Sequence, residues 1–334
     1  MHSETSGTKL AASITRPLVV VAGPTGSGKS ALGLKIASTY GGEIVNCDSL
    51  QLYRGFDVGT AKTRLSDRQG IRHHLLDVLE PDSVYSAGDY GRDAREIVSE
   101  ISDKGRLPVV VGGTGFYVRA LLDGLPELPG RDENLRTKLM LREERRPGTL
   151  HRLLTRLEPS TGGRVAGADL QKTLRALEIR LLTHLSLPPR SDAKPLSGYR
   201  VLQIGLSPDR GRLAEMIHQR TVEMFEPSDG SPGLVAEVKG LLDRGATGKE
   251  KPFEAIGYKQ VLKHLLDGWG LREAMESTEI ETRQYAKRQW TWFRRDGRVQ
   301  WLEGFGADAE VERVALEWVR ELLQAAPGES ERSL

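Results

Sequence analysis

Short apolar runs alternate with longer amphipathic stretches over much of this chain of 334 residues. Four runs have the length and composition of buried strands: residues 18–22, 43–47, 107–111 and 200–206. Apolar residues spaced three and four apart predict helices in the stretches between them: after Gly28, over 85–104 and over 209–224. Gly105 is expected to end the second of these helices.

The middle of the chain has a different pattern. Prolines and glycines mark boundaries at residues 125–130 and 187–195. Between about Asn134 and His184 the spacing is helical, charged residues are frequent, and we find no strand signal. We therefore expect a helical insertion. Its many arginines and lysines suit either a solvated helix face or a surface for nucleic acid.

A glycine-rich motif follows the first predicted strand. Its sequence, Gly23-Pro24-Thr25-Gly26-Ser27-Gly28-Lys29-Ser30, fits G-x-x-x-x-G-K-[ST] and lies between a strand and a helix, the context that this motif requires. Glycines let successive N–H groups turn toward one anion, and the helix N-terminus adds partial positive charge. Lys29 contributes a full charge, and the Ser30 hydroxyl can bind a divalent cation. The motif predicts a polyphosphate site.

Asp48 directly follows the second predicted strand. Ligands of open parallel sheets lie beyond the carboxyl ends of the strands, which places Asp48 near the phosphate loop. It is a candidate general base or an indirect ligand of the metal, and equally a candidate cap of the next helix.

The third predicted strand runs into Gly112-Gly113-Thr114-Gly115. A dinucleotide fingerprint would need a third glycine at Val118, and an ATPase of the common P-loop type would need an acid directly after Val111. Neither is present. The missing glycine weakens the dinucleotide interpretation, and the missing acid is evidence against phosphoryl transfer. Thr114 is a candidate substrate contact or a turn hydroxyl.

Two other stretches were considered as sites. His73 and His74 are adjacent and point in different directions, so a structural role is favoured over a metal site. Residues 282–295 are the most basic stretch, and on a helix Ala286, Trp290 and Phe293 would form an apolar stripe beside the charges. Basic and aromatic residues suit RNA, although core aromatics with solvated charges are the commoner explanation.

Composition narrows the class of protein. Hydrophobic residues make up 38% and charged residues 28%, as in a soluble globular protein. The net charge of +2 gives no global field for nucleic acid, so any basic surface must be local. With a single cysteine, Cys47, no intramolecular disulfide framework can form. The first sixteen residues lack a signal-peptide core and no run has membrane-spanning length, so we expect a cytoplasmic protein with a disordered N-terminal tail.

Taken in order, the motifs resemble a known family. The phosphate loop, the Asp48-Ser49 pair, residues 57–62, residues 112–115 and residues 282–295 are together similar to bacterial tRNA dimethylallyltransferases, the IPP transferase family. The resemblance implies an α/β fold: a P-loop NTPase-like core with a parallel sheet flanked by helices, plus an all-helical insertion. The bounds expected are 17–133 and 199–304 for the core, 134–198 for the tRNA-binding insertion, and 305–334 for a C-terminal helix and tail.

The resemblance also implies roles for individual residues. The reaction would move a dimethylallyl group from dimethylallyl diphosphate to the exocyclic amine of the adenosine 3′-adjacent to the tRNA anticodon, with Mg²⁺ at Ser30 and the protein acting as a monomer. Asp48, Thr25 and Arg220 would be catalytic. The diphosphate would be held by Gly23, Pro24, Thr25, Gly26, Ser27, Gly28, Lys29, Ser30 and Arg220. The tRNA would be contacted by Asp48, Ser49, Leu50, Gln51, Thr114, Arg136, Gln171, Lys172, Thr173, Leu174, Arg175, Gly257, Tyr258 and Lys259.

The chain departs from the family pattern at several positions. Lys172 and Met216 stand where arginines are usual, Ala168 replaces an asparagine, and residues 228–232 look inserted. Three alternatives stay open: a nucleotide kinase or ATPase, a prenyltransferase acting on free adenylate, and a non-catalytic RNA-binding protein. The absent acid after Val111 argues against the first, the helical insertion and basic stretch against the second, and the intact loop with Asp48 against the third.

Overall fold

The computed structural model describes residues 15–184 and 193–325. The chain divides into two compact units, one made of Met1–Leu122 with Leu196–Leu334, the other of Asp123–Pro195. A tail was expected over residues 1–16, and residues 1–14 of it lie outside the described residues. The first strand begins at Arg16.

The first unit is built on one parallel sheet. In the described chain its strands are β1 (Arg16–Ala22), β2 (Glu43–Asn46), β3 (His73–His74), β4 (Pro108–Val111), β5 (Tyr199–Leu206) and β6 (Val299–Leu302). Their order is β3-β2-β4-β1-β5-β6, and each neighbouring pair is parallel. The four predicted strands and the α/β fold are confirmed. The short β3 and β6 were not predicted, because β3 has two residues and β6 contains the exposed Gln300.

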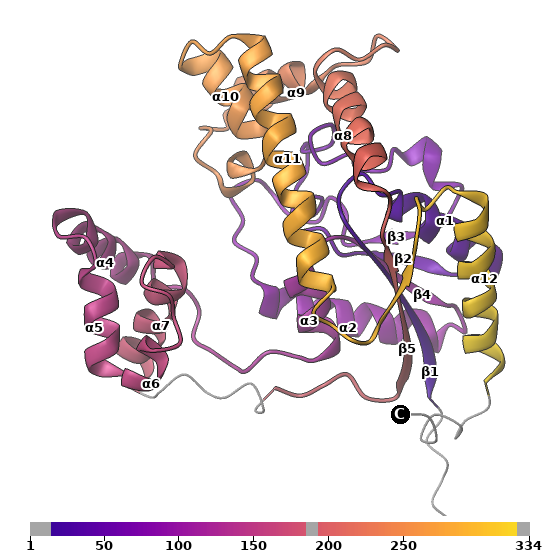
Figure 1. Ribbon diagram of the computed structural model, residues 1–334, viewed down its shortest axis with the longest axis horizontal. Coiled ribbons are helices and arrows are strands. Elements are labelled where there is room, and N and C mark those ends of the chain that lie inside the picture. Colours follow the sequence, from indigo (N-terminus) through magenta and orange to yellow (C-terminus); the bar gives the residue numbers. More distant parts are fainter. Residues whose placement is uncertain (1–14, 185–192, 326–334) are drawn as a thin grey trace, which may run out of the picture. The chain divides into compact units, whose positions relative to one another are not determined.

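Helices cover both faces of the sheet. Leu32 and Ile36 of α1 (Lys29–Tyr40) and Val311 of α12 (Ala309–Gln324) belong to one buried cluster with β1 and β4. A second cluster on the other face includes residues of α2 (Ala87–Asp103) and α3 (Gly115–Leu122). Figure 1 shows the helices on either side of the strands. The predicted helices after Gly28, over 85–104 and over 209–224 are confirmed, and Gly105 follows α2 with φ 70°.

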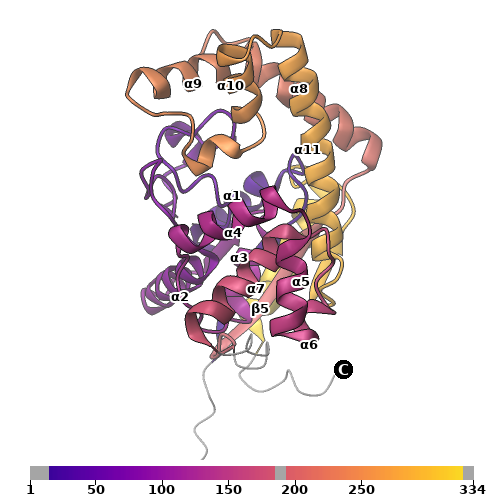
Figure 2. The same ribbon diagram turned by 90° about the vertical axis from the view of Figure 1, so that its left-hand side faces the viewer.

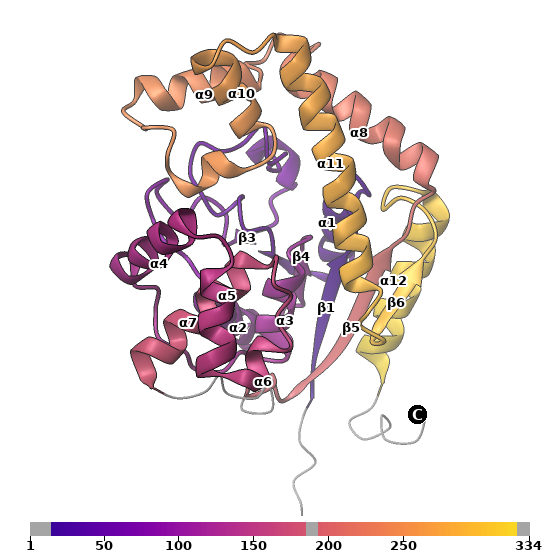
Figure 3. The same cartoon turned by 60° about the vertical axis from the view of Figure 1, so that its left-hand side comes forward.

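The C-terminal half of this unit adds further helices: α8 (Arg210–Phe225), α9 (Leu234–Asp243), α10 (Tyr258–Leu266) and α11 (Leu271–Phe293), with short 3₁₀ turns η1 (Leu65–Arg68) and η3 (Lys251–Glu254). Helices α8 and α11 contact each other and run side by side in Figures 1 and 3. Phe56 packs against Phe253 of η3 and Tyr258 of α10. The distances between ring centres are 5.1 Å and 4.8 Å. These aromatic contacts hold the loop that follows β2.

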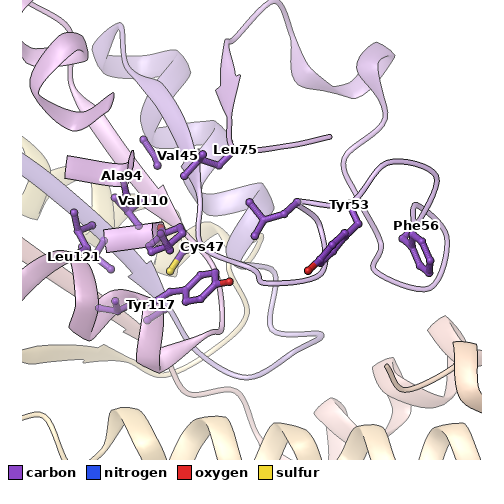
Figure 4. Packing of buried hydrophobic residues seen from close by; sticks show 14 of the residues in the cluster. Val45, Cys47, Tyr53, Phe56, Leu75, Ala94, Val110, Tyr117 and Leu121 are labelled. Carbon is purple, nitrogen blue, oxygen red and sulfur yellow. The ribbon is translucent and has the colours of Figure 1, made fainter. Parts of the chain in front are cut away.

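The core behind the β2 and β4 strand ends is apolar. Figure 4 shows Cys47, Val110, Tyr117 and Leu121 packed together there. Burial raises the pKa of the Cys47 thiol to about 12, so this group stays protonated and unreactive. His74 of β3 lies 2.6 Å from the buried Glu43 carboxylate, Nε2 to Oε2, which agrees with the structural role favoured for the adjacent histidines.

The second unit is helical. Its helices are α4 (Glu133–Arg145), α5 (Thr149–Leu157), α6 (Pro159–Gly162) and α7 (Leu170–Thr183). They share a small core of Leu139, Leu150, Leu154, Leu174 and Leu177. Figure 2 shows the four helices gathered together. The helical pattern predicted from Asn134 to His184 is confirmed in the described residues. The unit begins at Asp123, before residue 134. The N–H of Asp132 donates to the buried Glu178 and so ties the irregular segment before α4 to this unit. The sequence of that segment does not indicate this contact.

None of the helices in the described part of the chain is long and apolar enough to cross a membrane.

Candidate active site

The phosphate loop connects β1 to α1 as the motif predicts. Gly26 and Gly28 have φ of 81° and 83°, a region that glycine enters without strain. A Cβ at Gly28 would also come within 2.8 Å of the Gly306 nitrogen, because the turn after β6 packs on the loop. In that turn the Gly306 N–H donates to Ser27 O at 2.8 Å. The loop is therefore supported by a segment close to the C-terminus.

Lys29 is half-buried at the end of this loop. Its Nζ donates to Pro24 O at 2.6 Å. Burial lowers the pKa of Lys29 to about 8, the Asp48 carboxylate opposes this shift, and the Arg220 charge adds to it. A poorly solvated ammonium group beside a second cation is a site that favours an anion.

Arg220 reaches the loop from α8. Its Nη1 donates to Thr25 Oγ1 at 3.2 Å. Burial lowers the pKa of Arg220, and the charge of Asp48 opposes that shift. The structure thus brings Thr25 and Lys29 of the phosphate loop, Arg220 of α8 and Asp48 after β2 together, although they come from three separate segments.

Asp48 lies at the carboxyl end of β2. Its Oδ1 accepts from Leu50 N at 2.9 Å, and its own N–H donates to Asn46 Oδ1 at 3.0 Å. The carboxylate therefore caps a turn, whereas the sequence allowed for a helix cap; the chain after Asp48 turns instead of forming a helix. One oxygen holds the turn, and the half-buried carboxylate faces the charges of the phosphate loop.

Thr114 lies next to the Asp48 loop. Its Oγ1 accepts from Ser49 N at 3.2 Å, and its N–H donates to Cys47 O at 3.2 Å. Burial, and then the nearby charge of Asp48, raise the pKa of Tyr285 on α11, whose hydroxyl also interacts with Thr114. Gly112 permits this arrangement, because a Cβ there would lie 2.1 Å from Cys47 O. Gly112 therefore serves close packing of the β2 and β4 strand ends, whereas Gly113 and Gly115 make room for side chains of α11.

Gln289 on α11 is a site residue that sequence reasoning missed. Its side chain is 5% exposed. Its Oε1 accepts from Thr25 N at 2.7 Å, and its Nε2 donates to Gly113 O at 3.0 Å. The available signal was a polar residue within a buried stripe, between Ala286 and Phe293 at helical spacing.

The 282–295 stretch lies on α11 as far as Phe293, where the helix ends. Ala286 and Phe293 are buried. The Arg294 guanidinium lies 4.3 Å from the centre of the Trp290 ring, so part of the basic character is used within the protein. Arg283 pairs with Glu279 one turn earlier. RNA binding by this stretch stays a prediction.

The residues expected to contact tRNA in the first unit differ in exposure. Ser49, Leu50 and Gln51 are half-buried around the Asp48 turn. Tyr258, in contrast, is fully buried, and its hydroxyl donates to Glu237 at 2.6 Å. The expectation that the Tyr258 side chain contacts RNA therefore disagrees with its burial. Neighbouring Gly257 has φ 93° at the start of α10, and Lys259 pairs with Glu281.

In the second unit a buried acid organises several of these residues. Glu178 is fully buried, and its carboxylate pairs with Arg136 at 3.3 Å and Arg175 at 2.6 Å. Thr173 and Leu174 are 1% and 2% exposed. Their side chains belong to the core of the unit, which disagrees with the expected direct contact to RNA. Gln171 and Lys172 are exposed at the start of α7 and stay candidates.

A basic groove lies between α4 and α5 within the second unit. Its cavity volume is about 680 Å³. Six cationic side chains and three others line it: Lys138, Leu141, Arg142, Arg145, Arg146, Thr149, Arg152, Leu153 and Arg156. Each of these cations is exposed, and no acidic side chain lines the groove. Such a concentration of positive charge suits a phosphate backbone, and sequence reasoning did not single it out.

The donor set suits magnesium only in company with a phosphate. Ser30 is exposed in the first turn of α1, and among the described residues no group of three His, Cys, Asp or Glu could hold a metal ion. Mg²⁺ keeps several waters and often binds through substrate phosphates with few protein ligands. A single hydroxyl beside the phosphate loop fits an ion of that kind.

Two relatives match this chain over nearly its whole length. The chain is 49% identical over 309 residues to the tRNA dimethylallyltransferase of Solibacter usitatus, covering 92% of this chain and 99% of that protein. It is 45% identical to the tRNA dimethylallyltransferase of Koribacter versatilis over 91% of this chain and 98% of that one.

Solved structures show the same fold. The full-length tRNA isopentenylpyrophosphate transferase of Bacillus halodurans superposes with a TM-score of 0.67 at 32% identity, covering 92% of this chain and 97% of that one. A eukaryotic dimethylallyltransferase acting on tRNA gives a TM-score of 0.78 at 24% identity, covering 96% and 82%, and supports the fold alone. The family model described as IPP transferase matches residues 51–296. Together with the relatives that match it over nearly its whole length, this places the chain in the IPP transferase family.

Proposed function

We propose that this chain is a tRNA prenyltransferase that moves a dimethylallyl group from dimethylallyl diphosphate to the 6-amino nitrogen of the adenosine 3′-adjacent to the anticodon. The observation that carries the proposal is the position of Asp48, which interacts electrostatically with Lys29 and Arg220 beside the phosphate loop. A carboxylate next to a polyphosphate site places a base for one substrate against the leaving group of the other.

The acceptor amine needs a base. The lone pair of an adenine amine is delocalised into the ring, so the nitrogen is a weak nucleophile until its proton is removed. In the proposed step the nitrogen bonds to C1 of the dimethylallyl group, and the carboxylate of Asp48 takes the proton. The hydrogen bond from Leu50 N to Asp48 Oδ1 orients that carboxylate.

The donor needs stabilisation of its leaving group. As the bond between C1 and the bridging oxygen breaks, its electron pair leaves with the diphosphate. The N–H groups of the loop, the Lys29 ammonium and the Arg220 guanidinium stabilise that charge as it develops. The hydroxyl of Thr25 accepts a hydrogen bond from Arg220, which places Thr25 beside the proposed leaving group. A magnesium ion held through Ser30 would supply further positive charge to the diphosphate.

The RNA needs a larger surface than the reacting base. The target base must leave the stack of its loop to reach the half-buried carboxylate of Asp48, as in other enzymes that act on bases. The exposed arginines of the α4–α5 groove, with Gln171 and Lys172, offer contacts for the RNA backbone. We assign these contacts to positioning of the RNA. We assign the Asp48 turn to contact with the target adenine.

The deciding experiment is mass spectrometry of tRNA after incubation with the protein, dimethylallyl diphosphate and Mg²⁺. We expect one dimethylallyl group on the adenosine 3′-adjacent to the anticodon. Product on AMP in competition with tRNA would favour the adenylate prenyltransferase, and ATP hydrolysis without prenyl transfer would favour the kinase. Light scattering of the same sample tests the proposed monomer, and cell fractionation tests the proposed cytoplasmic location.

A further inference from the structure

The buried amide of Gln289 joins two loops that carry different parts of the site. One hydrogen bond goes to Thr25 in the phosphate loop, and the other to Gly113 in the loop after β4. We infer that Gln289 is a positioning residue that sets the distance between the loop binding the donor and the loop beside the acceptor base. The inference rests on the proposed function, because it assigns the two loops to two substrates.

The pair of contacts requires an amide. Thr25 presents an N–H and Gly113 a carbonyl, so the side chain must accept at one end and donate at the other. The space is also closed, since a Cβ at Gly113 would lie 2.0 Å from the Gln289 nitrogen. An ionised carboxylate of the same shape would still accept from Thr25 N, but it would place an oxygen without a proton against the Gly113 carbonyl.

The two hydrogen bonds extend into a longer connection. Strands β4 and β1 are neighbours in the sheet, so the loops that follow them lie at adjacent strand ends. Thr114, directly after Gly113, accepts from Ser49 N, and Ser49 follows Asp48. On the other side, Thr25 accepts from Arg220. Gln289 therefore lies between the proposed general base, Asp48, and the arginine proposed to stabilise the leaving group, Arg220. No hydrogen bond joins it to either residue.

This position predicts a specific kinetic effect. Each loop can still bind its own substrate when the amide is lost, but the reacting atoms are no longer aligned. Misplacement of about 1 Å can cost a hundredfold in rate. We expect Gln289→Met to lower kcat by roughly tenfold to a hundredfold, with the KM values for dimethylallyl diphosphate and for tRNA changed less than threefold, well below the effect on kcat.

A second buried glutamine supplies the matched control. Gln203 in β5 is 3% exposed, and its Oε1 has no hydrogen-bond partner. Gln203→Met makes the same exchange at another buried position of the same unit, and we expect its kcat to equal that of the wild type. If Gln289→Met loses only thermal stability and keeps its kcat, or if both variants lose activity equally, the inference is wrong.

Gln289→Glu provides a test by rescue. The protonated carboxyl matches the amide, because its carbonyl oxygen can accept from Thr25 and its hydroxyl can donate to Gly113 O. We expect the activity of Gln289→Glu, divided by that of the wild type at the same pH, to rise as the pH falls. Burial raises the pKa of such a carboxyl, which brings the change toward neutral pH. A ratio that does not vary with pH contradicts the inference.

A readout without catalysis separates this inference from the proposed function. The Thr25 N–H is covered by Gln289, so its exchange with solvent deuterium should be slow in the wild type and faster in Gln289→Met. Mass spectrometry of fragments carrying residues 23–30 measures this, with Gln203→Met as the control. Faster exchange in Gln289→Met than in the wild type, together with a wild type that prenylates no tRNA, would reject the function and keep the contact. Unchanged exchange in Gln289→Met would reject the positioning role whatever the reaction.

Discussion

Arg220 Nη1 donates a hydrogen bond of 3.2 Å to Thr25 Oγ1, joining α8 to a loop 195 positions earlier in the chain. A cation held in this way is positioned to meet an anion bound by the loop. We expect Arg220→Ala to weaken the binding of inorganic diphosphate by roughly tenfold to a hundredfold, the scale of one charged hydrogen bond. Isothermal titration calorimetry measures it. RNA affinity should change little, and Arg92→Ala, an exposed arginine of α2, is the control. Equal diphosphate affinity in Arg220→Ala and the wild type would contradict this role.

Asp48→Asn separates the two roles of that side chain. The amide oxygen can still accept from Leu50 N, so the turn should stay intact, but the group can no longer take a proton. We expect RNA binding to be retained and the rate of prenyl transfer to fall by roughly a hundredfold or more, the scale of a lost general base. Single-turnover kinetics with saturating tRNA measures the rate. Turnover near that of the wild type would remove Asp48 from the mechanism.

The pKa of Lys29 predicts a pH dependence of diphosphate binding. Burial lowers this pKa to about 8, so the ammonium is charged below pH 8 and neutral above it. We expect the affinity of the free protein for inorganic diphosphate to fall as the pH rises through this value. Lys29→Arg keeps its charge, and its affinity should follow only the ionisation of diphosphate itself. Identical pH profiles of the two proteins would show that Lys29 does not titrate in this range.

The α4–α5 groove predicts a salt-dependent contribution to RNA binding. Each phosphate contact releases counterions, so the loss of one contact lowers the salt dependence by about one unit of slope. We expect Arg142→Ala and Arg145→Ala each to weaken tRNA binding and to reduce that slope by about 1. Arg313→Ala on α12, where the side chain pairs with Glu310, is the control. Slopes equal to that of the wild type would exclude the groove from the RNA interface.

Glu178 predicts the stability of the helical unit. Removing one partner of a buried ion pair leaves uncompensated charge and typically costs roughly 3–5 kcal/mol. We expect Glu178→Ala to lower the free energy of unfolding of residues 123–195 by about that amount, because Arg136 and Arg175 lose their common acceptor. Hydrogen exchange under increasing urea measures this in the full chain. Glu144→Ala, exposed on α4, should have no comparable effect. A similar result for both variants would contradict the structural role.

Local patterns were sufficient for much of the fold. The runs at 18–22 and 107–111 are strands because continuous apolar sequence fits a sheet buried on both faces. The phosphate loop was found because its geometry depends on glycines and a lysine that are close in sequence. Asp48 was found because its position after a strand implies its place in space.

Contacts between distant segments could not be predicted in the same way. Gln289 meets Thr25 across 264 positions, and nothing in its neighbours along the helix indicates that partner. Arg220 was proposed only from the resemblance to a family. Tyr258 shows the opposite case, since a match to a motif does not reveal that the ring packs on Phe56 and is fully buried. Burial and long-range pairing depend on the whole fold, which single-sequence patterns do not contain.

The support of the phosphate loop by Gly306 bears on the order in which the protein matures during synthesis. The motif leaves the ribosome long before the turn that donates to Ser27 O, which is translated after α8 and α11. A growing polypeptide therefore carries the loop long before its late-made neighbours can hold it. The loop should bind its ligand only when β6 and the turn after it have emerged. An unfinished chain would therefore not bind the prenyl donor.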